Sequence, residues 1–440
     1  MAASSSTFKI LHTQSVTKSE DLNELANLLM QRWKQAEDLR YSWEFLNFIV
    51  NFLFLISEKR KDELEQLTAK IHDPEHDLHK EELASEELAI QDARGDTLLT
   101  WAVWYNDLAL TKALLKIKNF NINVQTKGGD TALTYAVRRP GYTECALALL
   151  ESGRCDVNLV DRDLNSALTL SSFNASLDVI KKIISLGPDL NKRNKAGESP
   201  LHLAILANRL DVVSALIEEK DCDLNTPDYN KRPPILQALS RSNYAIAERL
   251  IKENRCDLNQ TNWGGFTPLT YVLSRLRERP MAIDIARLLI DSPRCNFNLY
   301  NYAEKTPLMM AVEINRPDLL RAMLTAKRND IEKCDINLKT KCGTVLDFAM
   351  EISQREWRSC RDLSNIAILL EFGAKISKPR NFLLFLNKPD PKSKAIEICY
   401  AHLYAQHGPI PRNQGVEFFT QPSPLPLTSS PPQMVYTKKI

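Results

Sequence analysis

One short motif recurs along this 440-residue chain about every 34 residues. The copy that starts at Ser199 is Ser-Pro-Leu-His-Leu-Ala, and two more strong copies start at Thr267 and Thr306. The apolar third residue marks each copy, at Leu99, Leu133, Leu168, Leu201, Ile235, Leu269, Leu308 and Leu346. The steps between these residues are 33 to 35, lengthening to 39 and 38 at the end. A fixed period of this length predicts a solenoid, an architecture that usually serves binding rather than catalysis.

A second motif, Asp or Asn followed by an apolar residue and Asn, closes most repeats. It ends at Asn123, Asn158, Asn191, Asn225, Asn259, Asn298 and Asn337. A cysteine directly precedes it in five repeats, at Cys155, Cys222, Cys256, Cys295 and Cys334. Equivalent positions of neighbouring repeats lie roughly 10 Å apart, too far for a disulfide bridge or a shared metal ion. We therefore expect these cysteines to be small buried residues that pack behind each hairpin.

Both motifs resemble those of ankyrin repeats. The resemblance also rests on an aliphatic pair in the second half of most units, at Leu114-Leu115, Leu149-Leu150, Ile183-Ile184, Leu216-Ile217, Leu250-Ile251, Leu288-Leu289 and Leu369-Leu370. It covers residues 91–377, about eight repeats, and implies an all-α ankyrin-repeat solenoid of helix-turn-helix units with hairpin fingers. The chain departs from the family pattern because only His202 keeps the family histidine and the fifth repeat starts with Pro233-Pro234. These departures predict a divergent array of modest stability with the same fold.

The ends of the chain differ from the repeats. We expect residues 1–18 to be disordered and residues 19–90 to form a helical N-terminal domain that caps the array. The apolar run 45–56 is shorter than the roughly 20 residues of a transmembrane helix, which favours a buried helix over a membrane-surface segment. Residues 378–407 are predicted to form a C-terminal helical cap. The proline-rich tail 408–440 is predicted to be disordered.

Composition sets only broad limits. The 57 basic and 55 acidic residues give a net charge of +2, so charge alone does not indicate a nucleic-acid partner, and none is expected. Nine cysteines and no secretory segment predict a reducing setting, with the cytoplasm expected and the nucleus as the alternative. No catalytic, cofactor-binding or metal-binding motif is recognised. The cluster His72, His76 and His79 is interrupted by Pro74, which favours a charged loop over a metal site.

One residue at the tip of each predicted finger lies four positions before the first motif. Along the array these tips are first basic and then aromatic, namely Lys127, Arg162, Lys195, Tyr229, Trp263 and Tyr302, followed by Lys341 in a shorter finger. Basic tips are ordinary in ankyrin arrays, whereas three consecutive aromatic tips are not. Tyr and Trp are enriched at binding hot spots, so we expect the three rings, with neighbouring Tyr300, to anchor a protein or peptide. The alternative is that the rings pack on neighbouring fingers or on the N-terminal domain.

The two repeats with extra residues contain basic insertions. These hold Arg275, Arg277 and Arg279 in the sixth repeat, and Arg355, Trp357, Arg358 and Arg361 in the eighth. Both are predicted at the turn between the two helices, on the edge opposite the fingers. Arginine interleaved with tryptophan would suit an acidic partner or nucleic acid. A solvated loop is the alternative interpretation.

The sequence as a whole predicts a non-catalytic scaffold or adaptor that binds a protein or peptide in the concave groove of the array. Two alternatives stay open. One is an ankyrin-type inhibitor that retains a transcription factor in the cytoplasm, and the other is a membrane-peripheral adaptor that uses residues 45–56. An enzyme with an unrecognised domain in residues 1–90 ranks last. The identity of the partner and the oligomeric state are left open, because fold determines a binding surface and not its client.

Overall fold

The computed structural model describes residues 94–116, 120–326, 334–355 and 363–376, together with Leu28, Gln31, Gln91, 401–403 and 405–406. The chain forms two compact units, Met1–Trp263 and Gly264–Ile440. The predictions for residues 1–90, the apolar run 45–56, the histidine cluster and the tail 408–440 fall almost wholly outside the described residues. Within the predicted C-terminal cap, the described residues 401–403 and 405–406 are helical.

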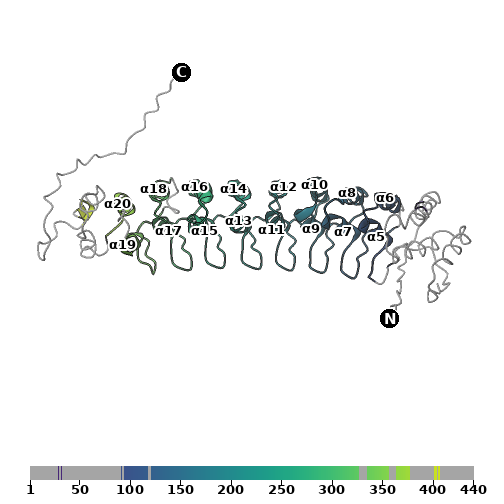
Figure 1. Ribbon diagram of the computed structural model, residues 1–440, viewed down its shortest axis with the longest axis horizontal. Coiled ribbons are helices and arrows are strands. Elements are labelled where there is room, and N and C mark those ends of the chain that lie inside the picture. Colours follow the sequence, from purple (N-terminus) through teal and green to yellow (C-terminus); the bar gives the residue numbers. More distant parts are fainter. Residues whose placement is uncertain are drawn as a thin grey trace, which may run out of the picture. The chain divides into compact units, whose positions relative to one another are not determined.

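The first unit contains five helix pairs in its described residues. In chain order they are α5 (Leu98–Trp104) with α6 (Leu108–Lys116), α7 (Ala132–Arg138) with α8 (Thr143–Glu151), α9 (Ala167–Asn174) with α10 (Leu177–Ser185), α11 (Pro200–Leu206) with α12 (Leu210–Glu218), and α13 (Pro234–Ser240) with α14 (Tyr244–Lys252). Within this unit the odd-numbered helices form one row beside the hairpin fingers, and the even-numbered helices form a second row farther from them (Figure 1). This is the helix-turn-helix repeat that the period predicts.

The second unit contains three more pairs in its described residues. They are α15 (Pro268–Arg275) with α16 (Ile283–Asp291), α17 (Pro307–Glu313) with α18 (Pro317–Thr325), and α19 (Val345–Arg355) with α20 (Ser364–Glu371). The short 3-10 helix η2 (Pro280–Ala282) lies between α15 and α16, in the longer turn that the stretched period indicates. The helices of this unit also stack in two rows, α15, α17 and α19 in one and α16, α18 and α20 in the other. The described chain is thus an all-α repeat array in both units.

The first motif begins the inner helices by capping them. The Thr97 hydroxyl accepts a hydrogen bond from the backbone N–H of Thr100 at 3.2 Å, and the Thr97 N–H donates to the Thr100 hydroxyl at 2.7 Å. Ser199 and His202 form the equivalent pair, with the Ser199 N–H 3.3 Å from Nδ1 of the imidazole. Threonine takes the place of the histidine in the pairs Thr131–Thr134, Ser166–Thr169 and Thr267–Thr270. In these repeats a threonine therefore takes over the hydrogen bonding of the missing family histidine.

The apolar third residue of the first motif lies in the core of every repeat. Leu99, Leu133, Leu168, Leu201, Ile235, Leu269, Leu308 and Leu346 are all buried. Full burial of such a side chain is worth about 1.5–3 kcal/mol, and it recurs once per repeat. The periodic leucine therefore supplies much of the packing between helix pairs.

The second motif forms a hydrogen-bonded ladder between repeats. The carboxamide oxygen of Asn191 accepts from the backbone N–H of Asp223 at 2.7 Å, and its nitrogen donates to the carbonyl of Asp221 at 2.7 Å. Asn225 makes the same two bonds one repeat later, to Asp257 and Arg255. Each asparagine thus joins its own repeat to the following one, which explains why the motif ends in Asn rather than in any polar residue.

The cysteines before the second motif are free thiols that are buried or half-buried. Cys222, Cys256 and Cys295 are buried, as expected, whereas Cys155 and Cys334 are half-buried. Burial raises the pKa of the Cys155 thiol to about 11 and that of Cys222 to about 12.

In the part of the chain that the structure describes, no helix is long and apolar enough to cross a membrane.

Candidate protein-binding surface

Four fingers of the first unit are each joined to the finger before by a backbone hydrogen bond at the tip. The N–H of Lys127 donates to the carbonyl of Arg94 at 2.8 Å, and the N–H of Tyr229 donates to that of Ala196 at 3.2 Å. Arg162 and Lys195 make the same bond in the two fingers between them. These bonds fix the height of every tip relative to its neighbour, so the tips of the first unit form an ordered edge (Figure 1).

A second feature of each finger is one residue with a left-handed backbone, which faces the tip of the next finger. In the first unit these residues and their φ values are Gly95 (83°), Gly129 (80°), Leu164 (63°), Gly197 (77°) and Lys231 (49°). In the second unit Gly265 (70°) and Glu304 (58°) hold the position. The residue at this left-handed position determines which contacts support the tip side chain of the next finger.

The Tyr229 ring packs against Gly197 of the preceding finger. A Cβ built on Gly197 would meet the Tyr229 ring at 2.7 Å, closer than real Cβ contacts come. The Arg193 guanidinium carbon lies 4.9 Å from the ring centroid, and its Nε donates to the Gly197 carbonyl at 2.9 Å. The ring is therefore supported from one side by the preceding finger, while 65% of the residue stays exposed.

Trp263 is held by a cation instead of a glycine. The Nζ of Lys231 lies 4.3 Å from the centroid of the Trp263 ring, within the range of a cation–π interaction. Trp263 is nevertheless 58% exposed. The tip therefore presents a supported ring to solvent, as Tyr229 does.

The second unit repeats both modes of support. A Cβ on Gly265 would meet the Tyr302 ring at 2.6 Å, and Tyr302 is 74% exposed. The Lys341 ammonium pairs with the Glu304 carboxylate at 2.9 Å, so the last basic tip is held by an ion pair. Tyr300, beside Tyr302, is also exposed. In both units, then, the aromatic tips contact the preceding finger and remain largely uncovered, and their role as anchors for a partner stays a prediction.

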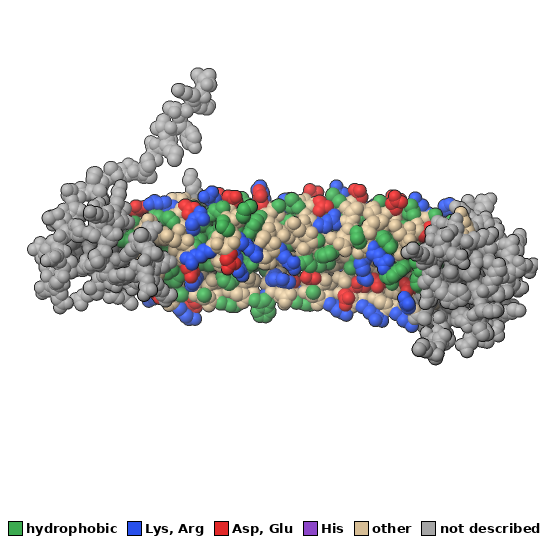
Figure 2. Space-filling view, in the orientation of Figure 1, with side chains coloured by type: hydrophobic (Ala, Val, Ile, Leu, Met, Phe, Trp, Pro, Cys, Tyr) green, Lys and Arg blue, Asp and Glu red, His purple; other side chains and the backbone are tan. Residues whose placement is uncertain are grey.

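The basic tips of the first unit differ among themselves. Lys195 pairs with Asp163 at 3.5 Å, on a surface where both side chains are well exposed. Lys127 and Arg162 are exposed, and among the described residues neither forms an ion pair. Figure 2 shows Lys and Arg side chains gathered along the finger edge over the first repeats, with hydrophobic side chains protruding farther along the same unit.

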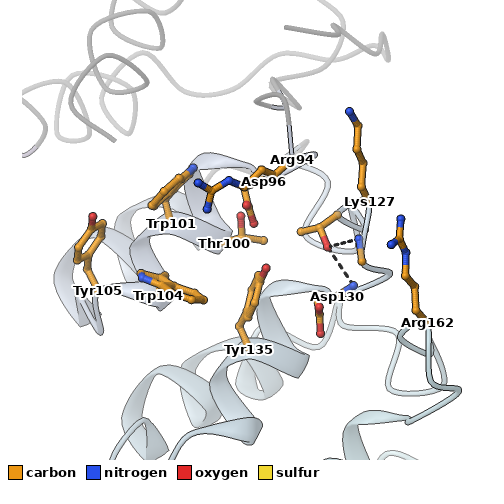
Figure 3. Close-up of a pocket in the computed structure, with 12 residues that line it drawn as sticks. Arg94, Asp96, Thr100, Trp101, Trp104, Tyr105, Lys127, Asp130, Tyr135 and Arg162 are labelled. Carbon is orange, nitrogen blue, oxygen red and sulfur yellow. Dashed lines mark hydrogen bonds between the residues drawn. The ribbon is translucent and has the colours of Figure 1, made fainter. Parts of the chain in front are cut away.

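A cavity behind these basic tips was not predicted from the sequence. It has a volume of about 530 Å³ and lies between the inner helices α5 and α7 and the first fingers (Figure 3). Its apolar wall includes Trp104 and Tyr135, and its rim includes Arg94, Lys127 and Arg162. In the sequence, this wall can be recognised by aromatic residues that lie four, seven or eight positions after the motif threonine. That spacing places them on the face of the inner helix that looks toward the fingers.

Hydrogen bonds and burial fix the polar groups inside the cavity. Burial, aided by the charge of Asp96, raises the pKa of Tyr135 to about 12. The Asp130 carboxylate pairs with Arg138 at 2.8 Å. Burial raises the pKa of that carboxyl, an effect that the Arg138 charge opposes. Tyr135 is therefore a neutral hydrogen-bonding phenol at physiological pH.

The basic insertion of the sixth repeat lies where it was expected, between α15 and α16. Arg275 pairs with Glu278 at 2.9 Å, and Arg277 donates to the carbonyl of Glu313. Arg279 is exposed just before η2, beside the exposed Met281. In the eighth repeat the backbone of Arg355 ends α19, while Trp357, Arg358 and Arg361 lie outside the described residues. A partner for either insertion stays a prediction.

Comparisons with known proteins bear on the family. The family model described as "Ankyrin repeats (3 copies)" matches residues 67–161 and 168–262. An intracellular phospholipase A2 of Caenorhabditis elegans is 31% identical over 147 residues, 31% of this chain and 13% of that protein. The nuclear factor NF-kappa-B p105 subunit of Gallus gallus is 29% identical over 189 residues, 33% of this chain and 19% of that protein. The chain thus spans less than a fifth of either curated relative.

Among solved structures, the ankyrin repeat domain of Bcl-3, described as a unique member of the IkappaB protein family, is 22% identical. The match has a TM-score of 0.44 and covers 52% of this chain and 99% of that chain. The family match falls on the repeats of the first unit, where the helix pairs, capped inner helices and stacked fingers are described. The chain therefore contains ankyrin repeats, over the residues that the family model matches.

Proposed function

We propose that this protein is a non-catalytic scaffold or adaptor that binds a segment of another protein on its finger surface. One observation carries the proposal: the rings of Tyr229 and Trp263 are each supported by the preceding finger and are still 65% and 58% exposed. A side chain that is already held in place loses little conformational freedom when a partner covers it. Tyrosine and tryptophan are also the residues most enriched at binding hot spots.

The second unit offers a surface of the same kind. Tyr302 is held over Gly265 and Tyr300 lies next to it, both exposed. We assign to these rings the same anchoring role as to the tips of the first unit. Covering one such ring would gain about 1.5–3 kcal/mol from apolar burial, before the costs of association.

The test is an affinity capture from cell lysate with the full chain and a Tyr229→Ala, Trp263→Ala, Tyr302→Ala variant. A Leu186→Ala variant is the matched control, because Leu186 is also an exposed apolar residue but follows the outer helix α10. The proposal expects specific proteins to be retained by the wild type and the control and lost by the triple variant, with circular dichroism showing all three folded. Identical capture by all three proteins would contradict it.

A second candidate is an inhibitor that retains a transcription factor in the cytoplasm. The similarity to the p105 subunit favours it, although that similarity covers only 19% of p105. Co-expression with a Rel-type factor and a reporter gene would test it: retention predicts a lower reporter signal and a cytoplasmic factor. An unchanged reporter with an unchanged location of the factor speaks for the scaffold alone.

Two further expectations belong to the same proposal. The similarity to the phospholipase covers 13% of that enzyme, so its activity is not carried over to this chain. We also propose a cytoplasmic location, with the nucleus as the alternative, in keeping with the seven free cysteines among the described residues. Imaging of the tagged full-length chain tests the location directly.

A further inference from the structure

The cavity of the first two repeats has the size and lining of a binding pocket. Its volume of about 530 Å³ falls within the range of about 300–1,000 Å³ that is usual for ligand sites. It lies between two inner helices and the first fingers, on the groove side of the first unit (Figure 3). It is therefore large enough to receive a bulky side chain with part of the backbone that carries it.

The apolar wall of this cavity is rigid. The Trp104 ring meets the Tyr135 ring edge to face, with centroids 5.6 Å apart and planes at 89°. The Arg139 guanidinium carbon lies 3.6 Å from the Trp104 centroid, and Arg139 does not line the cavity. Trp104 is still 41% exposed, although tryptophan is among the residues that gain most from burial. The indole is thus held from outside the cavity and left uncovered within the groove.

The rim of the cavity is basic. Arg94, Lys127 and Arg162 come from three successive fingers and are all exposed. Figure 3 shows the Lys127 and Arg162 side chains extending side by side along the finger edge of the cavity. Neither makes an ion pair among the described residues, so both charges can meet a carboxylate of a partner at little cost.

Two aspartates also line the cavity, and they restrict the chemical class of partner that it can bind. Asp96 and Asp130 line the cavity and are buried, close behind the basic rim. Their negative charge opposes the entry of the closely spaced phosphates of a nucleic acid, and the ion pair between Arg138 and Asp130 offsets part of this effect. The charge pattern therefore favours a peptide whose acidic side chains stay at the rim.

We propose that this cavity binds an extended peptide segment of a partner protein that carries a large apolar or aromatic residue next to acidic residues. The apolar side chain packs against Trp104 and Tyr135, and the acidic side chains pair with Lys127 and Arg162. The proposal rests on the proposed protein-binding function, but it uses residues separate from the aromatic tips. It assigns the partner a chemical class that those tips do not specify.

The experiment starts from a random peptide library displayed on phage and selected on the full-length chain. The affinity of the selected peptides is then measured by fluorescence anisotropy on the wild type and on three variants. The first is Trp104→Ala, and the second is the charge reversal Lys127→Glu, Arg162→Glu, which changes only exposed side chains and keeps the test meaningful if the first variant folds poorly. The third, Leu186→Ala, is the matched control, because Leu186 is an exposed apolar residue that follows the outer helix α10 and does not line the cavity.

The expected result is a selected set rich in acidic residues beside an aromatic or large aliphatic residue. Trp104→Ala should weaken binding by about tenfold or more, as the loss of a central anchor does. The charge reversal should also weaken binding, and replacing the acids of the peptide by lysine should restore it. Binding to the wild type should fall as salt rises, because the rim pairs are exposed. The control variant should bind as the wild type does.

Three outcomes would overturn the proposal. One is a selected set without the acidic and apolar pattern, and another is an affinity that neither pocket variant changes. The third is a labelled oligothymidine that binds in place of the peptides and is released by the charge reversal, which would assign the rim to nucleic acid. Loss of peptide binding in the Tyr229→Ala, Trp263→Ala, Tyr302→Ala variant, with both pocket variants binding normally, would move the peptide site to the aromatic tips. That result would leave the proposed function intact, so the two proposals fail separately.

Discussion

The Nζ of Lys231 lies 4.3 Å from the centroid of the Trp263 ring, at a finger position that is glycine in the preceding finger, at Gly197, and three fingers earlier, at Gly129. Lysine adopts the left-handed backbone there with a φ of 49°, which costs more than glycine would. The contact with the ring offsets part of this cost. The finger surface is thus held together by side-chain contacts as well as by backbone hydrogen bonds.

Replacing Lys231 by alanine is expected to lower the free energy of unfolding by about 0.5–1 kcal/mol, the usual worth of an exposed cation–π contact. Lys231→Arg keeps a cation over the ring and should retain most of the stability. Urea unfolding followed by circular dichroism measures both. In a Trp263→Ala background the alanine change should have almost no effect; an undiminished effect there would show that the ring is not the partner.

Gly197→Ala should destabilise the protein more than Gly187→Ala. Both glycines have a left-handed backbone, with φ of 77° and 69°, so both alanines carry a strain of about 1–2 kcal/mol. A Cβ on Gly187 meets nothing within 4 Å, whereas one on Gly197 meets the Tyr229 ring. The difference in unfolding free energy reports that contact together with the one to the Arg193 guanidinium, which the same Cβ would meet at 2.7 Å. It should shrink when Tyr229 is also replaced by alanine, and a difference that persists would locate the clash elsewhere.

The buried imidazole of His202 makes the free energy of unfolding depend on pH. Burial lowers the pKa of its imidazole from 6.5 to about 4, so protons bind preferentially to the unfolded chain. The stabilisation by neutral His202 is fully present above pH 6.5 and declines as pH falls toward 4, by about 3 kcal/mol in total. His202→Thr, which copies the caps of other repeats, should flatten this part of the curve. Parallel curves of unfolding free energy against pH for the two proteins would contradict the assignment.

Asn225→Ala should weaken the junction between the fourth and fifth repeats. The carboxamide makes two inter-repeat hydrogen bonds, at 2.7 and 2.8 Å, and their loss is expected to cost about 1–2 kcal/mol. Because repeats are stabilised by their neighbours, the unfolding transition should also broaden. Asn225→Asp keeps the acceptor and removes the donor, so an intermediate loss is expected. Equal stability of all three proteins in urea would show that water replaces both bonds.

Much of the array could be predicted because its signals are local. The apolar third residue of the first motif is buried in every repeat. Thr97 and Thr131 each cap a helix that starts at the next residue. The tips at Tyr229 and Trp263 also lie where the spacing places them. A helix cap and a helix face depend on residues within one turn of each other, so their pattern can be read along the chain.

The cavity could not be predicted in the same way. Trp104 and Tyr135 are ordinary aromatic residues in their own helices, and only their edge-to-face contact makes a wall. Lys127 and Arg162 were predicted as tips of the partner-binding surface but not as the rim of a cavity, because neighbouring repeats form the space beside them. Contacts of this kind depend on side-chain rotamers and on the stacking of neighbouring units. Neither is encoded in the spacing of a single motif.

The sequence by itself determined the repeat, its helix pairs and the residues that stand at each fingertip, because burial and capping recur with a fixed period. Only the tertiary structure decided how those tips are held. Tyr229 rests on Gly197, Trp263 lies under the cation of Lys231, and Lys341 is paired with Glu304. The physical reason is that each tip is supported by the preceding finger, more than thirty residues away in sequence. Its exposure is therefore set by stacking rather than by its own neighbours along the chain.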